Sequence, residues 1–213
     1  AGSFVYVTWV DKRDIVITNY EIYYKYSSDA GINWSVDTRM TNDVYYSLSP
    51  SISVSESVIN LIWEDWRDNN SEIYYKRSTD NGMNWSTDTR LTNNSSASNS
   101  PCIMSSSLSG GSLLQIVWED YRDGNYEIYY KRSTDEGLNW NADVRLTNNT
   151  AYSERSSIAI SGTVVYVVWE DTRDGNWEIY YKRSVDAGLN WEEDTRLTNN
   201  TANSVYPFIA VSG

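Results

Sequence analysis

The sequence predicts an all-β fold, a four-bladed β-propeller made of four-stranded antiparallel blades. The first observation is a motif, Ser-x-Asp-x-Gly-x-Asn-Trp, that occurs four times at intervals of 51, 55 and 51 residues. The second is that each copy belongs to a unit of about 50 residues with four strand-like segments. The third is that the chain begins with the second kind of segment and ends with the first kind, as a closed ring requires.

The fourth unit shows these segments most clearly, and we call them A, B, C and D in chain order. Segment A, 157–162, alternates apolar and small polar residues, as a half-buried strand does. Segment B, 164–169, is β-branched and aromatic, and an Asp-Gly turn at 174–175 separates it from segment C, 177–183. Segment D, 195–198, follows the repeated motif. Four such strands joined by turns are typical of one propeller blade.

The two ends of the chain predict how the blades are completed. The chain begins with a B segment, 4–9, and ends with an A segment, 206–211, that no B segment follows. If the last segment joins the first blade, the ring closes without a free edge. We therefore predict a single domain, 1–213, that forms a monomeric ring; the alternative is a part of a larger ring that a second chain completes. The predicted blades are 4–41 plus 206–211, 51–92, 102–147 and 157–198.

Composition excludes several classes of function. The net charge is −12, which disfavours nucleic acid as a partner, because binding to phosphates depends on Lys and Arg. The chain has no His, which excludes Ser-His-Asp triads and ordinary zinc sites. Its single Cys, Cys102, is expected to be a small buried hydrophobe, since no His is present to activate it. No apolar run is long enough for membrane insertion.

The repeated motif resembles the Asp-box, also called the bacterial neuraminidase repeat, and its four copies with their flanking strands cover nearly the whole chain. The resemblance implies a sialidase-like β-propeller scaffold in which the motif forms the turn between segments C and D. The Asp can accept hydrogen bonds from turn amides, the Gly can adopt positive φ, and we expect the Trp ring to pack over the hairpin below it. A catalytic carboxylate is needed once, so four copies indicate a structural role. We call the four copies the SDGNW turns; their key residues are Asp29, Gly31, Trp34, Asp80, Gly82, Trp85, Asp135, Gly137, Trp140, Asp186, Gly188 and Trp191.

A second repeated motif, Trp-Glu-Asp-x-Arg-Asp-x-Asn-x-Glu, spans 63–72, 118–127 and 169–178, and an altered form spans 9–21. Asp and Arg two residues apart at a hairpin end suit a charged pair that caps turn amides, and repetition favours this structural role. The alternative is an acidic ring whose oxygens bind Ca²⁺, although the Arg would compete with a cation. An ion held by segment A carbonyls in the central channel is a separate hypothesis. We assign no metal ligands and expect no other cofactor.

Aromatic residues vary between the blades inside this second motif, and they are the candidate ligand-binding residues. Aromatic rings beside polar groups are suited to sugars, because a flat face packs on C–H groups while polar groups bind hydroxyls. In a propeller, the B–C and D–A loops share one face and the SDGNW turns lie on the opposite one. The alternative is that these rings only brace neighbouring blades. The candidates are Tyr20, Trp66, Tyr121, Tyr126 and Trp177.

The first blade differs from the other three in its B–C connection. This connection, 11–20, is three residues longer than its counterparts, and Val10 stands where the other blades have Glu64, Glu119 and Glu170. A single special site would therefore be expected at this loop.

The sequence favours a non-catalytic recognition module over an enzyme. Sialidases of the family that the chain resembles grip their substrate with three Arg and carry an Arg-Ile-Pro segment, which this sequence lacks. Nearly all Arg residues belong to the repeats, Arg155 being the exception, and we assign no catalytic residue. We expect a carbohydrate-binding, lectin-like protein, secreted or at a cell surface, with a glycan or protein ligand. The alternatives are a sialidase-like glycoside hydrolase and a purely structural or protein-interaction propeller.

Overall fold

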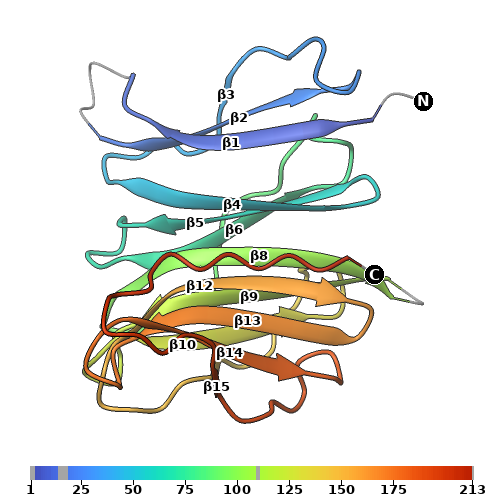
Figure 1. Ribbon diagram of the computed structural model, residues 1–213. Coiled ribbons are helices and arrows are strands. Elements are labelled where there is room, and N and C mark those ends of the chain that lie inside the picture. The colour runs from blue at the N-terminus through green and yellow to red at the C-terminus, as the bar shows by residue number, and fades with distance from the viewer. Residues whose placement is uncertain (1–2, 14–18, 109–110, 213) are drawn as a thin grey trace. The chain divides into compact units, whose positions relative to one another are not determined.

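The computed structural model describes residues 3–13, 19–108 and 111–212. The chain forms two compact units, Ala1–Asn93 and Asn94–Gly213, and each unit contains two β-sheets (Figure 1). Within the described ranges, no helix is long and apolar enough to cross a membrane.

The first unit holds two antiparallel sheets. The first sheet has the order β1-β2-β3, and the second has the order β4-β5-β6-β7. The strands are β1 (Val5–Asp11), β2 (Glu21–Ser27), β3 (Thr38–Arg39), β4 (Ser47–Ser55), β5 (Val58–Asp65), β6 (Glu72–Ser78) and β7 (Thr89–Arg90).

The second unit also holds two antiparallel sheets, the third and the fourth of the chain. Their orders are β8-β9-β10-β11 and β12-β13-β14-β15. The strands are β8 (Ser98–Leu108), β9 (Gly111–Asp120), β10 (Glu127–Ser133), β11 (Val144–Arg145), β12 (Ser153–Ser161), β13 (Val164–Asp171), β14 (Glu178–Ser184) and β15 (Thr195–Arg196).

These sheets confirm the all-β fold and the A-B-C-D order of segments. In each sheet, strands that follow one another in the chain pair side by side, as in a propeller blade. Segment D contributes only two paired residues per sheet, because the chain leaves the sheet soon after the SDGNW turn.

The first sheet has three strands among the described residues, and segment 206–211 is not one of them. This segment is hydrogen-bonded to the fourth sheet. The Tyr206 N–H donates to Glu170 Oε2 at 2.7 Å, and the Ile209 N–H lies 3.4 Å from Ser157 Oγ. Pairing of 206–211 with β1, which would close the ring, therefore stays a prediction.

The A strands begin four residues earlier than predicted, at Ser47, Ser98 and Ser153. Each contains a bulge in which two residues are left unpaired. The first unpaired residue has positive φ in each case: Ser49 at 50°, Ser100 at 50° and Arg155 at 52°. Pro50 and Pro101 lie among the unpaired residues of two of these bulges, where a residue that cannot donate to the ladder is tolerated. Tyr206 has the same backbone, with φ 59°, so segment 206–211 starts as the A strands do.

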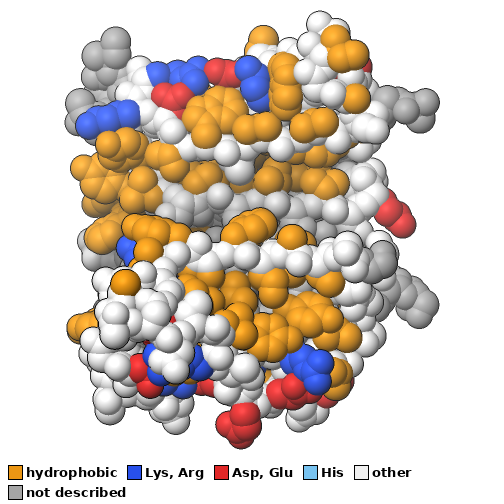
Figure 2. Space-filling view, viewed as in Figure 1, with side chains coloured by type: hydrophobic (Ala, Val, Ile, Leu, Met, Phe, Trp, Pro, Cys, Tyr) orange, Lys and Arg blue, Asp and Glu red, His pale blue; other side chains and the backbone are white. Residues whose placement is uncertain are grey.

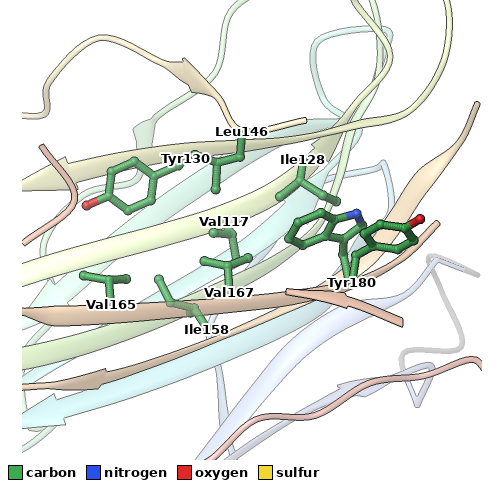
Figure 3. Packing of buried hydrophobic residues seen from close by; sticks show 9 residues of the cluster. Val117, Ile128, Tyr130, Leu146, Ile158, Val165, Val167 and Tyr180 are labelled. Atoms are coloured by element: carbon green, nitrogen blue, oxygen red, sulfur yellow. The ribbon is translucent and has the colours of Figure 1, made fainter. Parts of the chain in front are cut away.

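The core of each unit lies between its two sheets. In the second unit, side chains of β9 and β10 meet those of β12 and β13 (Figure 3). Cys102 is half-buried and packs against this cluster, as expected of a small hydrophobe. The buried cluster of the second unit consists of Val117, Ile128, Tyr130, Leu146, Ile158, Val165, Val167, Trp169 and Tyr180, and that of the first unit consists of Ile22, Tyr24, Met40, Leu61, Trp63 and Tyr74.

The SDGNW turns are held by their own Ser and Asp side chains. In the last turn, Asp186 accepts hydrogen bonds from the Asn190 N–H at 2.8 Å and from the Ser184 hydroxyl at 2.7 Å. The Gly188 N–H donates to Ser184 Oγ at 2.9 Å. These bonds, with the backbone bond from Asn190 foremost, lower the pKa of Asp186 to about 2. These bonds agree with the structural role predicted for these residues, and Ala187 and Gly188 both have positive φ, 59° and 82°.

We expected the Trp ring of each turn to pack over the hairpin below it. In two of the turns this ring also contacts the neighbouring sheet of the same unit. The Trp191 ring meets Tyr130 of the third sheet edge-on at 5.0 Å, and Trp85 meets Tyr24 of the first sheet at 5.3 Å. Each of these Trp rings therefore contacts the preceding sheet within its unit. The reason is that the buried Tyr and the turn lie at the same end of adjacent sheets, where aromatic edges and faces attract.

Candidate functional site

The B–C turns and the D–A linkers meet in each unit, as predicted. The N–H groups of Trp66, Tyr121 and Thr172 each donate to a linker carbonyl at 3.0 Å; the acceptors are Tyr46, Ala97 and Tyr152 in that order. We call this surface of a unit its loop face. It consists of 12–13, 19–20, 43–46 and 66–71 in the first unit, and of 94–97, 121–126, 149–152 and 172–177 in the second.

The Asp and Arg of the second motif form a structural pair beneath the loop face, in which the Asp is buried and the Arg half-buried. Asp120 is fully buried and accepts the Trp118 indole N–H at 2.9 Å and the Arg122 N–H at 3.0 Å. Arg122 also bonds Asp143 at 2.8 Å and lies 4.4 Å from the centroid of the Tyr129 ring. Burial acts to raise the pKa of the equivalent Asp171, but its hydrogen bonds from Arg173 and Trp169 outweigh burial and lower it. These charges therefore hold the turn and are not offered to a ligand.

The second Glu of the motif is also engaged. Glu127 is fully buried and accepts from Arg145 at 2.8 Å, from Asn125 at 2.9 Å and from the Thr147 hydroxyl. Within the described residues, no group of three or more Asp, Glu or Cys side chains is placed to hold a metal ion. The carboxylates considered for Ca²⁺ are bound by Arg and Asn, as their structural interpretation predicts. The ion hypothesised for a central channel stays a prediction.

In the second unit, three Tyr rings gather on the loop face. Tyr121 and Tyr126 meet edge-on with centroids 5.0 Å apart, and Tyr126 lies 6.3 Å from Tyr152 of the D–A linker. Asn99 Nδ2 donates to the Tyr126 hydroxyl at 3.1 Å. Tyr121 and Tyr152 are exposed, at 38% and 44%. Two of the predicted candidates thus come together, and Tyr152 joins them from a linker that the sequence analysis placed on this face without naming the residue.

In the first unit, the corresponding group is Tyr20, Tyr46 and Trp66. The Tyr20 and Tyr46 rings are 5.8 Å apart, and the Lys12 ammonium lies 5.2 Å from the Tyr20 centroid. The Trp66 indole donates to Glu64 Oε1 at 2.9 Å, so its ring is held in one orientation. Tyr20 and Trp66 are each 39% exposed. The nearby residues 14–18 of the longer B–C connection, where we expected symmetry to break, lie outside the described residues.

Trp177, the last candidate, is half-buried. Its N–H donates to Asn203 Oδ1 at 3.3 Å, and its carbonyl accepts from the Ser204 N–H at 2.8 Å. The neighbouring B–C position is Thr172, so the fourth sheet has fewer rings on its loop face than the third.

A further group of side chains, which we did not predict from the sequence, lies where the bulges of the A strands begin. The Arg155 N–H donates to Glu119 at 2.6 Å, and its guanidinium pairs with the buried Glu170 and lies 4.5 Å from the Tyr206 centroid. Burial raises the pKa of Glu119 to about 7, and Glu154 nearby adds to this against the bond from the Arg155 N–H. The only sequence signal was that Arg155 stands outside the repeated Arg positions. The first Glu of the second motif thus bonds the A-type segment that follows.

Glu119 predicts a pH dependence of folding. Its folded-state pKa of about 7 lies above the ordinary 4.5, so the folded chain binds more protons between these values and is destabilised as pH rises through them. We expect this group to cost roughly 3 kcal/mol of unfolding free energy above pH 7 relative to below pH 4.5. Glu119→Gln should remove that loss in urea titrations across this range. Glu193→Gln, at an exposed position, is the control. If the unfolding free energy of Glu119→Gln changed with pH as that of the parent does, the raised pKa of Glu119 would be contradicted.

Comparison with known proteins gives matches among solved structures alone. No family model matches the chain, and no curated protein matches it. NanB, in a structure with Optactamide, is 12% identical with a TM-score of 0.66, covering 95% of this chain and 51% of its own. A *Trypanosoma rangeli* sialidase in complex with the inhibitor DANA is 14% identical with a TM-score of 0.61, covering 89% of this chain and 36% of its own.

The solved structures with a similar fold also include an arabinofuranosidase. A mutant of an α-L-arabinofuranosidase from *Fusarium graminearum* is 15% identical with a TM-score of 0.64, covering 94% of this chain and 65% of its own. The chain spans about half the length of several matched sialidases, 51% to 53%. At such identities the likeness shows the fold alone. The chain therefore has a sialidase-like β-propeller scaffold.

Proposed function

We propose that the protein is a non-catalytic carbohydrate-binding module that recognises glycans with its loop face. The observation that carries this proposal is the contrast between two sets of residues there. The repeated Asp and Glu of the last three blades are buried and bonded to Arg and Asn, whereas three of the rings that vary between blades, Tyr20, Trp66 and Tyr121, are exposed. Exposed rings of this kind bind the C–H faces of sugars, and the adjacent polar groups bind hydroxyls.

The arrangement supports several similar weak sites rather than one strong site. The Tyr121–Tyr126–Tyr152 group and the Tyr20–Tyr46 group repeat the same plan on two different sheets. Binding to a branched or repeated glycan would then gain from multivalency. The proposal therefore includes a secreted or cell-surface location for the protein.

Glycan-array binding followed by calorimetry tests the proposal. We expect millimolar or tighter binding of at least one glycan, and a loss of about tenfold for Tyr121→Ala or Trp66→Ala, because each removes a stacking ring. Leu138→Ala removes an exposed apolar side chain from the turn 136–139 and serves as the control, expected to bind as the parent does. Absence of any glycan hit at millimolar concentration would refute the proposal.

The competing function is glycoside hydrolysis, because the solved structures with a similar fold include a sialidase and an arabinofuranosidase. Most glycosidases need two carboxyl groups that flank the scissile bond, whereas sialidases use a Tyr nucleophile together with acidic residues. On the loop face, the carboxylates of the second motif are bound to Arg, Asn and Trp side chains. Release of a fluorophore from a sialoside or another glycoside, abolished by Glu119→Gln or Arg155→Ala, would favour the enzyme instead.

A further inference from the structure

A pocket of about 440 Å³ lies in the second unit, between the third sheet and the SDGNW turn of the fourth sheet. It lies at the end of β10 that leads into the third SDGNW turn, whereas the loop face begins at the other end of this strand. The glycan sites of the proposed function therefore do not include this pocket. Its lining contains Tyr130, Arg132, Asn141, Val144, Gly188 and Leu189.

Tyr130 and Gly188 form the buried side of the pocket. The Tyr130 side chain is held in place, because its hydroxyl donates to Gln115 Oε1 at 2.7 Å. Its ring lies at one end of the buried cluster, with the hydroxyl directed away from Leu146 (Figure 3). A Cβ at Gly188 would clash with this hydroxyl, so the turn and the ring are in close contact. The packing of the two sheets thus forms the pocket in the unliganded chain, as is usual for binding sites of small molecules.

Arg132 gives the pocket a guanidinium whose charge is balanced by no carboxylate among the described residues. Its Nη1 donates to the Ala187 carbonyl at 2.9 Å, which orients the side chain. Its Nε and Nη2 donate to no other atom of the residues that the structure describes. Asp186 is not its partner, because the carboxylate oxygens of Asp186 accept from Ser184 and Asn190. The remaining N–H groups of Arg132 are therefore available to a ligand.

The corresponding Arg of the fourth sheet is paired with a carboxylate of the chain itself. Arg183 stands at the position of Arg132, and its Nε donates to Glu192 Oε2 at 2.6 Å. Glu192 and Asn141 occupy equivalent places, because the N–H of each donates to the carbonyl of the Arg in its own sheet at 2.9 Å. Figure 2 likewise shows Lys and Arg side chains beside Asp and Glu over the fourth sheet. Since Asn141 carries no charge, a carboxylate that pairs with Arg132 must come from a ligand.

Leu189 and Val144 give the pocket an apolar side. Leu189 is 62% exposed and Val144 is 41% exposed, so a ligand can cover both. In the first unit, Tyr26 stands at the position of Arg132, and its ring lies 6.3 Å from the Tyr24 ring. A Tyr cannot supply the charge that Arg132 supplies, so the cationic form of this pocket belongs to the second unit. A ligand that matches it has an anionic group and an apolar part.

We propose that this pocket binds a small organic acid, whose carboxylate pairs with Nε and Nη2 of Arg132 and whose apolar part covers Leu189 and Val144. A carboxylate matches two parallel N–H donors of a guanidinium, which makes the pair strong and directional. The Asn141 side chain can donate a further hydrogen bond to the same carboxylate. The net charge of −12 repels anions at long range, so we expect millimolar affinity. The proposal does not depend on glycan binding at the loop face.

Titration of the isotope-labelled whole chain with benzoate and with benzamide, followed by NMR, tests this pocket. The two compounds have nearly the same shape, and only benzoate carries a charge. For benzoate we expect saturable shifts of the signals of 130–132 and 187–189, including the Arg132 Nε–H, with a Kd of about 1–10 mM. Benzamide should bind about tenfold more weakly or less, because it lacks the charge-assisted pair. Equal binding of both compounds, or no saturable shift with benzoate at about 50 mM, would overturn the proposal.

Two substitutions should abolish the carboxylate site in different ways. Arg132→Gln removes the charge, and Asn141→Glu supplies from the chain the carboxylate that Glu192 supplies in the fourth sheet. Each should weaken benzoate binding by about tenfold or more. Arg183→Gln is the matched control and should bind benzoate as the parent does, because Glu192 already occupies Arg183. Asn141 is exposed, so Asn141→Glu should fold as the parent does even if Arg132→Gln does not, and urea unfolding checks both. If Asn141→Glu left benzoate binding unchanged, the assignment to Arg132 would be wrong.

Discussion

Gly188→Ala is expected to destabilise the protein by about 3 kcal/mol or more, one of the largest effects of a single methyl group in this chain. Two costs combine. Gly188 has φ 82°, where an L side chain is strained by about 1–2 kcal/mol. The new Cβ would also lie 1.9 Å from the Tyr130 hydroxyl and 2.5 Å from its ring carbon Cζ. Tyr130 cannot retreat easily, because it is 1% exposed, bonds Gln115 at 2.7 Å and meets the Trp191 ring.

Gly31→Ala is the matched control, since Gly31 occupies the same position of the first SDGNW turn with φ 88°. Its Cβ would meet nothing closer than 3.9 Å, so only the backbone strain should be felt, about 1–2 kcal/mol. Urea unfolding followed by tryptophan fluorescence measures both. Equal losses in the two variants would show that contact between the sheets adds nothing at Gly188.

Asp171→Ala should cost about 3–5 kcal/mol, because it leaves a charge and an indole without their acceptor. Asp171 is fully buried and accepts from the Trp169 indole at 3.0 Å, the Arg173 N–H at 2.9 Å and the Ser153 hydroxyl at 2.8 Å. Its folded-state pKa is lowered, so its stabilising effect is present above the ordinary pKa of 3.8 and is lost as pH falls through the folded value. The difference between parent and variant should therefore shrink in acid.

Asp11→Ala is the control for this buried pair. Asp11 has the same partners by sequence, Trp9 and Arg13, but the Arg13 side chain is 45% exposed. An ion pair near water contributes about 1 kcal/mol or less. Thermal unfolding of both variants at pH 7 and in acid distinguishes the two sites, and a loss of similar size at pH 7 would show that burial is not what makes Asp171 important.

The local roles of these residues could be predicted from the sequence, and their distant partners could not. The positive φ of Gly188 and the pairing of Asp171 with Arg173 both follow from residues within a few positions in the chain. The contact of Gly188 with Tyr130 joins residues in different sheets, so it depends on how two blades pack. For the same reason the sequence analysis placed the Trp of the SDGNW turn on its own hairpin, whereas Trp191 packs on the third sheet.

The candidate site divides in the same way. Tyr121 and Tyr126 are five residues apart in one turn, so their proximity could be expected, but Tyr152 joins them only because a linker hydrogen-bonds to the next turn. The group of Glu119, Arg155, Glu170 and Tyr206 gave almost no sequence signal. Its members come from β9, β12, β13 and the C-terminal segment, and bulges in the A-type segments bring their backbone N–H groups to the carboxylates.

The sequence by itself determined the repeat, the order of strands within a blade and the structural role of the SDGNW turns, because period and turn chemistry are local properties of the chain. Only the tertiary structure decided which repeated charges are buried and which rings gather on the loop faces. These depend on burial between sheets: Leu146 packs in the buried cluster of the second unit and is 4% exposed, whereas the equivalent Leu197 is 55% exposed.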